Sequence, residues 1–302
     1  MKKFVKFSMA IGLSFALVGI ANAQNGNALV SALREALQFE FNFNENAADE
    51  SGNNFTATLQ GAALAQDANK TLGRSCGFTA SENGMMVVDH DPKLNPTTMT
   101  LATWVFGGEA LAGPASIIHK MDSAAKAGYE LRRNAANDTF EWRFYDTQGT
   151  LHTVESTTKI GKGQWHYVTA VFDGLRSKLY IDGKLEGEKL AAGNIKHALT
   201  DLIFANGEAP FDGNLDNIIL ADMPMNVGDV ETLWGRQKAG PGTDTFGLTD
   251  NTIFIPNLII EGQKEGDGSP QLEVELEAVQ GGASGEELLF KLKSLFLKPT
   301  SQ

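Results

Sequence analysis

GQWHYVTAVFDG at residues 163–174, followed by KLYIDGK at residues 178–184, is the stretch of sequence that decides the fold. In a strand, successive side chains point to opposite faces, and both faces of Trp165–Phe172 are largely apolar. Such a strand belongs near the middle of a packed sheet. Asp182-Gly183 then lies between apolar flanks, and this dipeptide supplies the positive φ angles of a tight turn. The stretch therefore predicts a central strand followed by a hairpin with its tip at Asp182-Gly183.

Short alternating or apolar segments recur on both sides of this stretch. The earliest begins at Leu37, where Leu37, Phe39, Phe41 and Phe43 alternate with polar residues. No segment from there to Leu220 has the period of a long amphipathic helix. Because each short strand has one apolar face to hide, the pattern predicts an all-β fold, either two stacked antiparallel sheets or a barrel. The other predicted strands are Met85–Val88, Met99–Phe106, Tyr129–Arg132, Phe140–Tyr145, His152–Glu155, Lys178–Ile181, Leu202–Phe204 and Leu215–Leu220.

The flanking segments differ in pattern from this region. Leu29, Leu33 and Leu37 recur at every fourth position, which predicts a short helix within residues 24–36, before the sandwich. The sandwich is assigned to residues 37–235 and ends in a helix at Val227–Trp234. Residues 236–250 are rich in glycine, threonine and charge and are predicted to be a linker. Residues 251–302 are predicted to form a small β-rich module, in which Leu272–Val279 alternates as a strand and Leu288–Leu297 fits either a strand or a short helix.

The first 23 residues have the pattern of a secretory signal peptide. Three lysines precede an apolar run that is shorter than a membrane span, and Ala21 and Ala23 suit cleavage before Gln24. We therefore expect a protein that is secreted, periplasmic or attached to the cell surface, without a transmembrane anchor after cleavage.

Charge and cysteine content limit the partners. The formal net charge of -12 repels phosphate backbones, so nucleic acid is not an expected partner. Cys76 is the only cysteine, which excludes an intramolecular disulfide. We expect Cys76 to be a small buried side chain.

The region from Leu37 to Trp234 resembles the laminin-G-like (concanavalin A-like) jelly-roll family of secreted bacterial proteins. This resemblance implies a two-sheet antiparallel β-sandwich (jelly roll) for residues 37–235. The segment that matches the family most specifically is the stretch at residues 163–184. The other matching segments are Phe41-Asn42-Phe43, Asp49–Asn53, Leu101–Val105, Gly128–Leu131, Phe211–Ile218 and Leu233-Trp234.

The resemblance also implies a structural calcium site at Asp49, Asn53 and Asp216. In relatives, the acidic residue of the early turn and the aspartate of the late strand often meet at a calcium ion. Calcium prefers oxygen ligands, which Asp49, Ser51 and Asn53 crowd into one turn. Asp216 is expected to share a strand face with Ile218 and Leu220, where an unpaired charge is costly. The alternative is that Asp49 caps a turn and that Asp216 accepts backbone hydrogen bonds.

A carbohydrate-binding face is predicted at Trp142, Arg143 and Tyr145. Exposed aromatic rings stack on the apolar face of a sugar while polar neighbours bind its hydroxyls. Alternation places Trp142 and Phe144 on one side of the strand and Arg143 and Tyr145 on the other. The competing interpretation is that these aromatic side chains belong to the core.

Patterns typical of catalysis are missing from the sequence. The sandwich region lacks the compact paired-acid signature of the related β-glucanases, and the alternating Glu273, Glu275 and Glu277 lie in the tail. The five histidines have no metal-ligand spacing, and no Gly-x-Ser-x-Gly motif is present. We therefore predict an exported, non-catalytic binding or adhesion protein that recognises a glycan or an extracellular protein surface. A glycan-active enzyme and an architectural envelope protein remain as alternatives.

Overall fold

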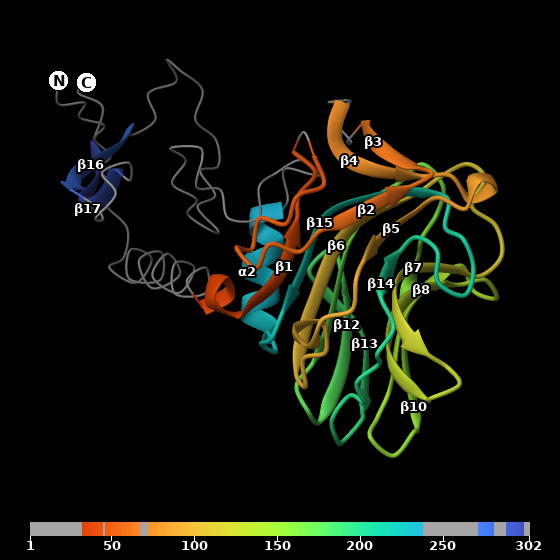
Figure 1. Cartoon of the computed structure of the whole chain (residues 1–302). Coiled ribbons are helices and arrows are strands. Elements are labelled where there is room, and N and C mark those ends of the chain that lie inside the picture. Colours follow the sequence, from red (N-terminus) through yellow and green to blue (C-terminus); the bar gives the residue numbers. More distant parts are fainter. Residues whose placement is uncertain (1–31, 45, 67–71, 238–270, 281–287, 299–302) are drawn as a thin grey trace. The chain divides into compact units, whose positions relative to one another are not determined.

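The computed structural model describes residues 32–44, 46–66, 72–237, 271–280 and 288–298 (Figure 1). The chain divides into two compact units, and one of them lies within residues 24–256. The signal peptide predicted at residues 1–23 and most of the predicted linker lie outside the described residues. Of the predicted N-terminal helix, residues 32–36 are described, and they are helical. Within the described ranges, no helix is both long enough and apolar enough to cross a bilayer.

Sheet 1 has eight strands in the order β13-β12-β11-β6-β15-β4-β3, and β1 pairs with β15 beside this path. The pairs within it are antiparallel. Its strands are β1 (Leu37–Phe41), β3 (Ala62–Gln66), β4 (Leu72–Phe78), β6 (Met99–Gly107), β11 (Trp165–Phe172), β12 (Arg176–Ile181), β13 (Lys184–Leu190) and β15 (Gly213–Ala221).

Sheet 2 has seven strands in the order β10-β9-β8-β7-β14-β5-β2, again antiparallel throughout. Two short 3-10 helices, η1 (Ala80–Glu82) and η2 (Pro92–Leu94), flank β5 in the sequence. The strands of sheet 2 are β2 (Ala57–Gln60), β5 (Met85–Val88), β7 (Ala115–Asp122), β8 (Ala127–Asn134), β9 (Thr139–Tyr145), β10 (Leu151–Lys159) and β14 (Leu202–Phe204).

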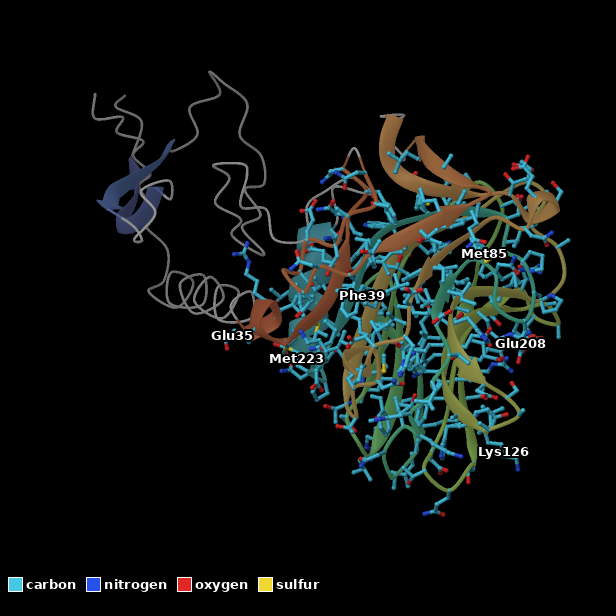
Figure 2. The ribbon with its side chains drawn as sticks, viewed as in Figure 1. Glu35, Phe39, Met85, Lys126, Glu208 and Met223 are labelled. Atoms are coloured by element: carbon cyan, nitrogen blue, oxygen red, sulfur yellow. The ribbon has the colours of Figure 1, made fainter. Side chains whose placement is uncertain are left out.

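The main core lies between the two sheets. Phe144 of sheet 2 packs on Phe172 of sheet 1 with ring centroids 4.6 Å apart. Phe39 of β1 meets Phe204 of β14 edge to face at 5.9 Å, and Figure 2 shows Phe39 in the interior. Aromatic pairs at such distances add to the free energy gained from burial of their apolar area. The predicted two-sheet antiparallel sandwich of the jelly-roll kind is confirmed.

Helix α2 (Val227–Gln237) lies beside sheet 1 (Figure 1), and a second apolar cluster lies under it, on the side of the sheet away from the main core. Trp234 of α2 packs against Trp104 and Tyr167, with ring centroids 5.6 and 6.1 Å apart. Gln237 Oε1 accepts hydrogen bonds from Trp104 Nε1 and Asn217 Nδ2. These bonds secure the last turn of α2, so the helix runs past Trp234 and past the sandwich boundary predicted at residue 235.

The hairpin predicted at Asp182-Gly183 is confirmed. Ile181 pairs with Lys184, and the two turn residues have φ angles of 50° and 76°. Asp182 also accepts a hydrogen bond from the Tyr167 backbone amide. The turn is therefore fastened to the central strand β11 that precedes it.

The prediction that Asp216 shares a strand face with Ile218 and Leu220 was wrong. The register of β15 against β6 shifts between Asp216 and Ile219, and Asn217 adopts a left-handed φ of 43°. This β-bulge inserts one residue into the alternation. Ile218 and Leu220 consequently face the main core, whereas Asp216 pairs with Trp104 of the cluster under α2. Because a bulge adds one residue to the strand, every residue after it points to the opposite face from the one that simple alternation predicts.

The second compact unit includes an antiparallel hairpin of β16 (Gln271–Gln280) and β17 (Leu288–Lys298). The predicted strand at Leu272–Val279 lies within β16. Leu288–Leu297 is a strand, so the alternative of a short helix was wrong.

Candidate functional site

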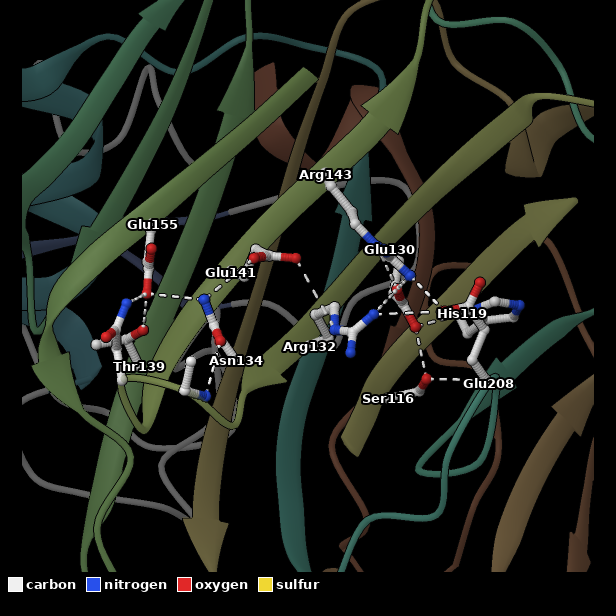
Figure 3. A network of polar contacts seen from close by, with 12 residues as sticks. Ser116, His119, Glu130, Arg132, Asn134, Thr139, Glu141, Arg143, Glu155 and Glu208 are labelled. Carbon is white, nitrogen blue, oxygen red and sulfur yellow. Dashed lines mark hydrogen bonds and ion pairs between the residues drawn. The ribbon is translucent and has the colours of Figure 1, made fainter. Parts of the chain in front are cut away.

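Strands β7, β8 and β9 carry a polar network (Figure 3), and its residues alternate along β8 and β9 with residues of the main core. Directly opposite residues in an antiparallel pair point to the same face. Glu130 of β8 lies opposite His119 of β7 and Arg143 of β9, and Arg132 lies opposite Glu141. The alternate residues of β8 and β9 are buried in the main core. We call the side chains of His119, Glu130, Arg132, Glu141, Arg143 and Tyr145 the outer face of sheet 2.

Glu130 is the buried centre of this network. Its side chain has 0 % exposure, and its Oε1 accepts hydrogen bonds from Ser116 Oγ at 2.5 Å and from His119 Nδ1 at 3.0 Å. Burial raises the pKa of a carboxyl group, but the hydrogen bonds from His119 and Ser116 and the charge of Arg143 outweigh burial and lower the pKa of Glu130. The Glu130 carboxylate therefore stays ionised in the interior.

Arg143 joins this buried carboxylate to the surface. Its Nε donates to Glu130 Oε2 at 2.6 Å, and its Nη2 donates to Glu208 Oε2 at 2.7 Å. The Arg143 side chain is 13 % exposed, and that of Glu208 is 41 % exposed. A guanidinium with two carboxylate partners is held in one orientation. Arg143 is therefore a fixed, partly exposed hydrogen-bond donor.

Arg132 lies beside Arg143 but is less firmly held. Its Nη1 is 3.4 Å from Glu208 Oε2 and 3.8 Å from Glu130 Oε2, and its Nε is 3.9 Å from Glu141 Oε1. Strong bonds between guanidinium and carboxylate are about 2.7–2.9 Å long. The Arg132 side chain is 16 % exposed, and its guanidinium therefore has N–H donors that solvent or a ligand can reach.

Glu141 and Glu155 form the other end of the network in Figure 3. They lie opposite each other on β9 and β10. Burial raises the pKa of Glu141 in spite of the nearby arginine charges. Hydrogen bonds from Thr139, Asn137 and Asn134 lower the pKa of Glu155. The structure thus places an acid with a raised pKa beside a carboxylate with a lowered one.

The three predicted ligand-binding residues separate onto two faces. Arg143 and Tyr145 lie on the outer face of sheet 2. Trp142 has 0 % exposure and packs in the main core against Tyr129, with ring centroids 5.7 Å apart. Its inclusion in the ligand-binding set was wrong, because a sugar cannot stack on a ring enclosed between two sheets.

The structure does not gather the three predicted calcium ligands. The turn of Asp49 and Asn53 lies along β1, where the Asp49 carboxylate accepts a hydrogen bond from the Glu40 backbone amide. Asn53 Nδ2 donates to the Leu37 and Gln38 carbonyls on the same strand. β1 pairs with β15, the strand that carries Asp216, so β1 lies between this turn and Asp216.

The bonding of the Asp49 turn fits a cap better than a calcium site. The Asp49 carboxylate accepts hydrogen bonds from three backbone amides, those of Glu40, Ser51 and Phe55, and from the Ser51 hydroxyl. Asn53 Oδ1 accepts from the Lys93 ammonium at 2.5 Å. Throughout the described ranges, no three His, Cys, Asp or Glu side chains are grouped to hold a metal ion. Calcium binding by Asp49, Asn53 and Asp216 therefore stays a prediction.

Replacing Asp49 with alanine is expected to lower the free energy of unfolding by about 2 kcal/mol, because backbone amides lose a charged acceptor. The loss should be the same in calcium and in EDTA. The exposed Asp89 provides the control, since Asp89→Ala should change stability by less than about 0.5 kcal/mol. Urea unfolding in both buffers measures this. Stabilisation of the wild type by calcium that disappears in Asp49→Ala would instead establish the calcium site.

A surface pocket of about 270 Å³ also involves Asn53. It is lined by residues 53–56, 88–91 and Lys93. Beside it, the buried Lys120 ammonium contacts His90 Nδ1 at 3.1 Å and the Thr200 carbonyl, and burial lowers the pKa of Lys120 to about 8. The Lys93 and Lys120 ammonium groups thus already bind protein oxygens and nitrogens, so this pocket is the weaker candidate.

Comparisons with known proteins agree with this architecture. Residues 80–231, half of the chain, match a laminin-G family described as the concanavalin A-like lectin/glucanases superfamily. A search of the curated proteins found none with a similar sequence.

Solved structures share the fold. The binding domain of Paraclostridial Mosquitocidal Protein 1 has a TM-score of 0.58 at 15% identity, over 86% of this chain and 76% of that one. The botulinum neurotoxin serotype D ligand-binding domain, solved with N-acetylneuraminic acid, has a TM-score of 0.56 at 15% identity, over 68% of this chain and 52% of that one. The botulinum neurotoxin DC binding domain, solved with rat synaptotagmin II, has a TM-score of 0.55 at 12% identity, over 67% of this chain and 52% of that one. The chain thus spans about half the length of the neurotoxin domains.

Proposed function

The chain belongs to the concanavalin A-like lectin/glucanase superfamily, and from this membership we propose that it is an exported binding protein that holds a glycan on the outer face of sheet 2. Structural neighbours that are themselves binding domains support a binding role. Export is inferred from the signal-peptide pattern of residues 1–23. A shared fold does not determine function, so the proposal depends on the outer face itself.

The observation that carries the proposal is the pair of partly exposed arginines, Arg132 and Arg143, of which Arg143 is held by the buried Glu130 carboxylate. Burial of an ion pair costs desolvation energy, and an apolar replacement is often as stable. Compared with an apolar replacement, the whole ion pair brings no gain in stability, but Glu130 fixes Arg143 as a donor beside Arg132. Donors in fixed positions lose little entropy when they bind sugar hydroxyls.

Tyr145 adds an apolar surface to these donors. It follows Arg143 by two residues on β9 and is half-buried on the outer face. An aromatic ring beside polar groups is a common arrangement for stacking on a sugar ring. The outer face therefore offers both kinds of contact that a pyranose needs.

Arg132→Gln and Tyr145→Ala are each expected to weaken glycan binding by at least about tenfold, the equivalent of one good contact. A glycan array followed by calorimetry on the purified protein measures this. Arg176→Gln is the matched control, because Arg176 is 50 % exposed on sheet 1 and pairs with Glu188. Absence of binding to any glycan, or equal losses from the Arg176 variant, would overturn the proposal.

A glycan-active enzyme is the second candidate, and the Glu141–Glu155 pair favours it. Retaining glycosidases use one carboxyl group with a raised pKa as an acid and a second, ionised one as a nucleophile. The pKa directions of Glu141 and Glu155 match these roles. However, Glu155 already accepts hydrogen bonds from three side chains. Release of reducing ends from the bound glycan, lost in Glu141→Gln, would favour the enzyme.

A further inference from the structure

We propose that Glu208 holds the place of a ligand carboxylate, so that the Arg132–Arg143 pair binds the acid group of an acidic sugar and the Glu208 side chain swings away when the sugar binds. The inference rests on the proposed glycan-binding function and names the ligand class. It follows from how differently Glu130 and Glu208 contact the two arginines.

Glu130 and Glu208 both bind Arg143, but they differ in burial and in their other hydrogen-bond partners. Glu130 is fully buried on β8 and is bound by Ser116 and His119 as well as by Arg143. Glu208 comes from the loop between β14 and β15 and is 41 % exposed. Water reaches Glu208 and not Glu130. Glu208 is therefore the partner that a ligand can replace.

Arg132 has unused donors beside this position. Its guanidinium carries five N–H donors, and in the described part of the chain it donates one long hydrogen bond, of 3.4 Å, to Glu208 Oε2. Arg143 Nη2 donates to the same oxygen at 2.7 Å. A sugar carboxylate free to approach from solvent could meet both guanidinium groups at full hydrogen-bond strength.

The loop that carries Glu208 is fastened by its backbone. Ser116 N donates to the Ala209 carbonyl at 2.9 Å, and Ala205 N donates to the Ile117 carbonyl at 2.8 Å. Among the described residues, the Glu208 side chain itself is bound to Ser123 Oγ and to the partly exposed Arg132 and Arg143. Rotation of this side chain breaks no backbone contact. Displacement of Glu208 therefore leaves the sheet intact.

The charge of the protein and the residues of the outer face favour one class of ligand, a glycan with an isolated acidic sugar. The formal net charge of -12 repels polyanionic chains. One carboxylate can still bind the two arginines, and Tyr145 lies on the same face for contact with the sugar ring. Uronic acids and sialic acids share this chemistry.

The test measures the affinity of the purified protein for oligosaccharides that end in glucuronic acid or sialic acid, and for the same oligosaccharides without the acidic sugar. Glu208→Gln is expected to raise affinity for the acidic sugars by about tenfold and to leave the neutral ones unchanged. Arg132→Gln should abolish the preference for acid. Glu188→Gln is the matched control, since Glu188 pairs with Arg176 on sheet 1.

Each outcome separates this inference from the proposed function. Equal binding of acidic and neutral sugars, unaffected by Glu208→Gln, would overturn the inference while leaving glycan binding in place. Failure of every sugar to bind would overturn both. Preferential binding of a glutamate-rich peptide through Arg132 and Arg143 would overturn the sugar class. A selective gain for either acidic sugar supports the inference and identifies which acid is preferred.

Discussion

Glu130→Ala is expected to lower the free energy of unfolding by about 3–5 kcal/mol, the usual cost of breaking a buried ion pair from one side. The substitution removes the carboxylate that Ser116, His119 and Arg143 all contact. Of the described residues, Arg143 would then keep Glu208, which is exposed, as its one partner at hydrogen-bond distance. Urea unfolding followed by circular dichroism measures the loss as a shift in midpoint.

Glu188→Ala is the control for this effect, because Glu188 forms its ion pair with Arg176 near the surface. A pair of that kind contributes at most about 1 kcal/mol. Similar losses of unfolding free energy in the two variants would mean that water reaches Glu130. The Glu130 carboxylate would then not hold Arg143 in a fixed position.

Trp142→Ala should cost about 3–5 kcal/mol of folding free energy, as is usual for removal of a fully buried aromatic side chain. Tyr145→Ala on the opposite face of the same strand should cost less than about 1 kcal/mol. Thermal unfolding of the two variants compares core and surface within one strand. A stable Trp142 variant that fails to bind glycans would restore Trp142 to the binding site.

The parts of the fold that the sequence predicts are those in which local pattern and tertiary environment agree. β11 has two apolar faces because it is packed on both sides, by the main core and by the cluster under α2. The hairpin at Asp182 is encoded by two adjacent residues with positive φ. Both signals are local, so a single sequence is enough to predict them.

Strands without that agreement were predicted in part or not at all. The hairpin prediction implied that a strand follows Gly183, but not how far it extends: β13 has the sequence KLEGEKL and forms an edge of sheet 1, where it needs no continuous apolar face. β7 has the sequence ASIIHKMD, in which His119 and Lys120 interrupt the apolar pattern. Both residues are nevertheless buried, because His119 finds a polar partner in Glu130 on the next strand and Lys120 finds partners in His90 and Thr200, far along the chain. Tertiary contacts of this kind have no local signal.

The candidate site was predicted only in part. Alternation along β9 places Arg143 and Tyr145 together, and the structure agrees. The pairing of Glu130 with Arg143 depends on the register of β8 against β9, which alternation within one strand cannot supply. Glu208 comes from a loop far along the chain. The charged residues at alternate positions of β8, Glu130 and Arg132, were the available signal.

Mapping the bound glycan on the protein by NMR tests the central claim most directly. Amide chemical-shift changes on titration with a glycan selected from the array should be centred on β8, β9 and the loop of Glu208. Changes centred on the pocket lined by residues 53–56 and 88–91, with the amides of Arg132, Arg143 and Tyr145 unaffected, would contradict the account.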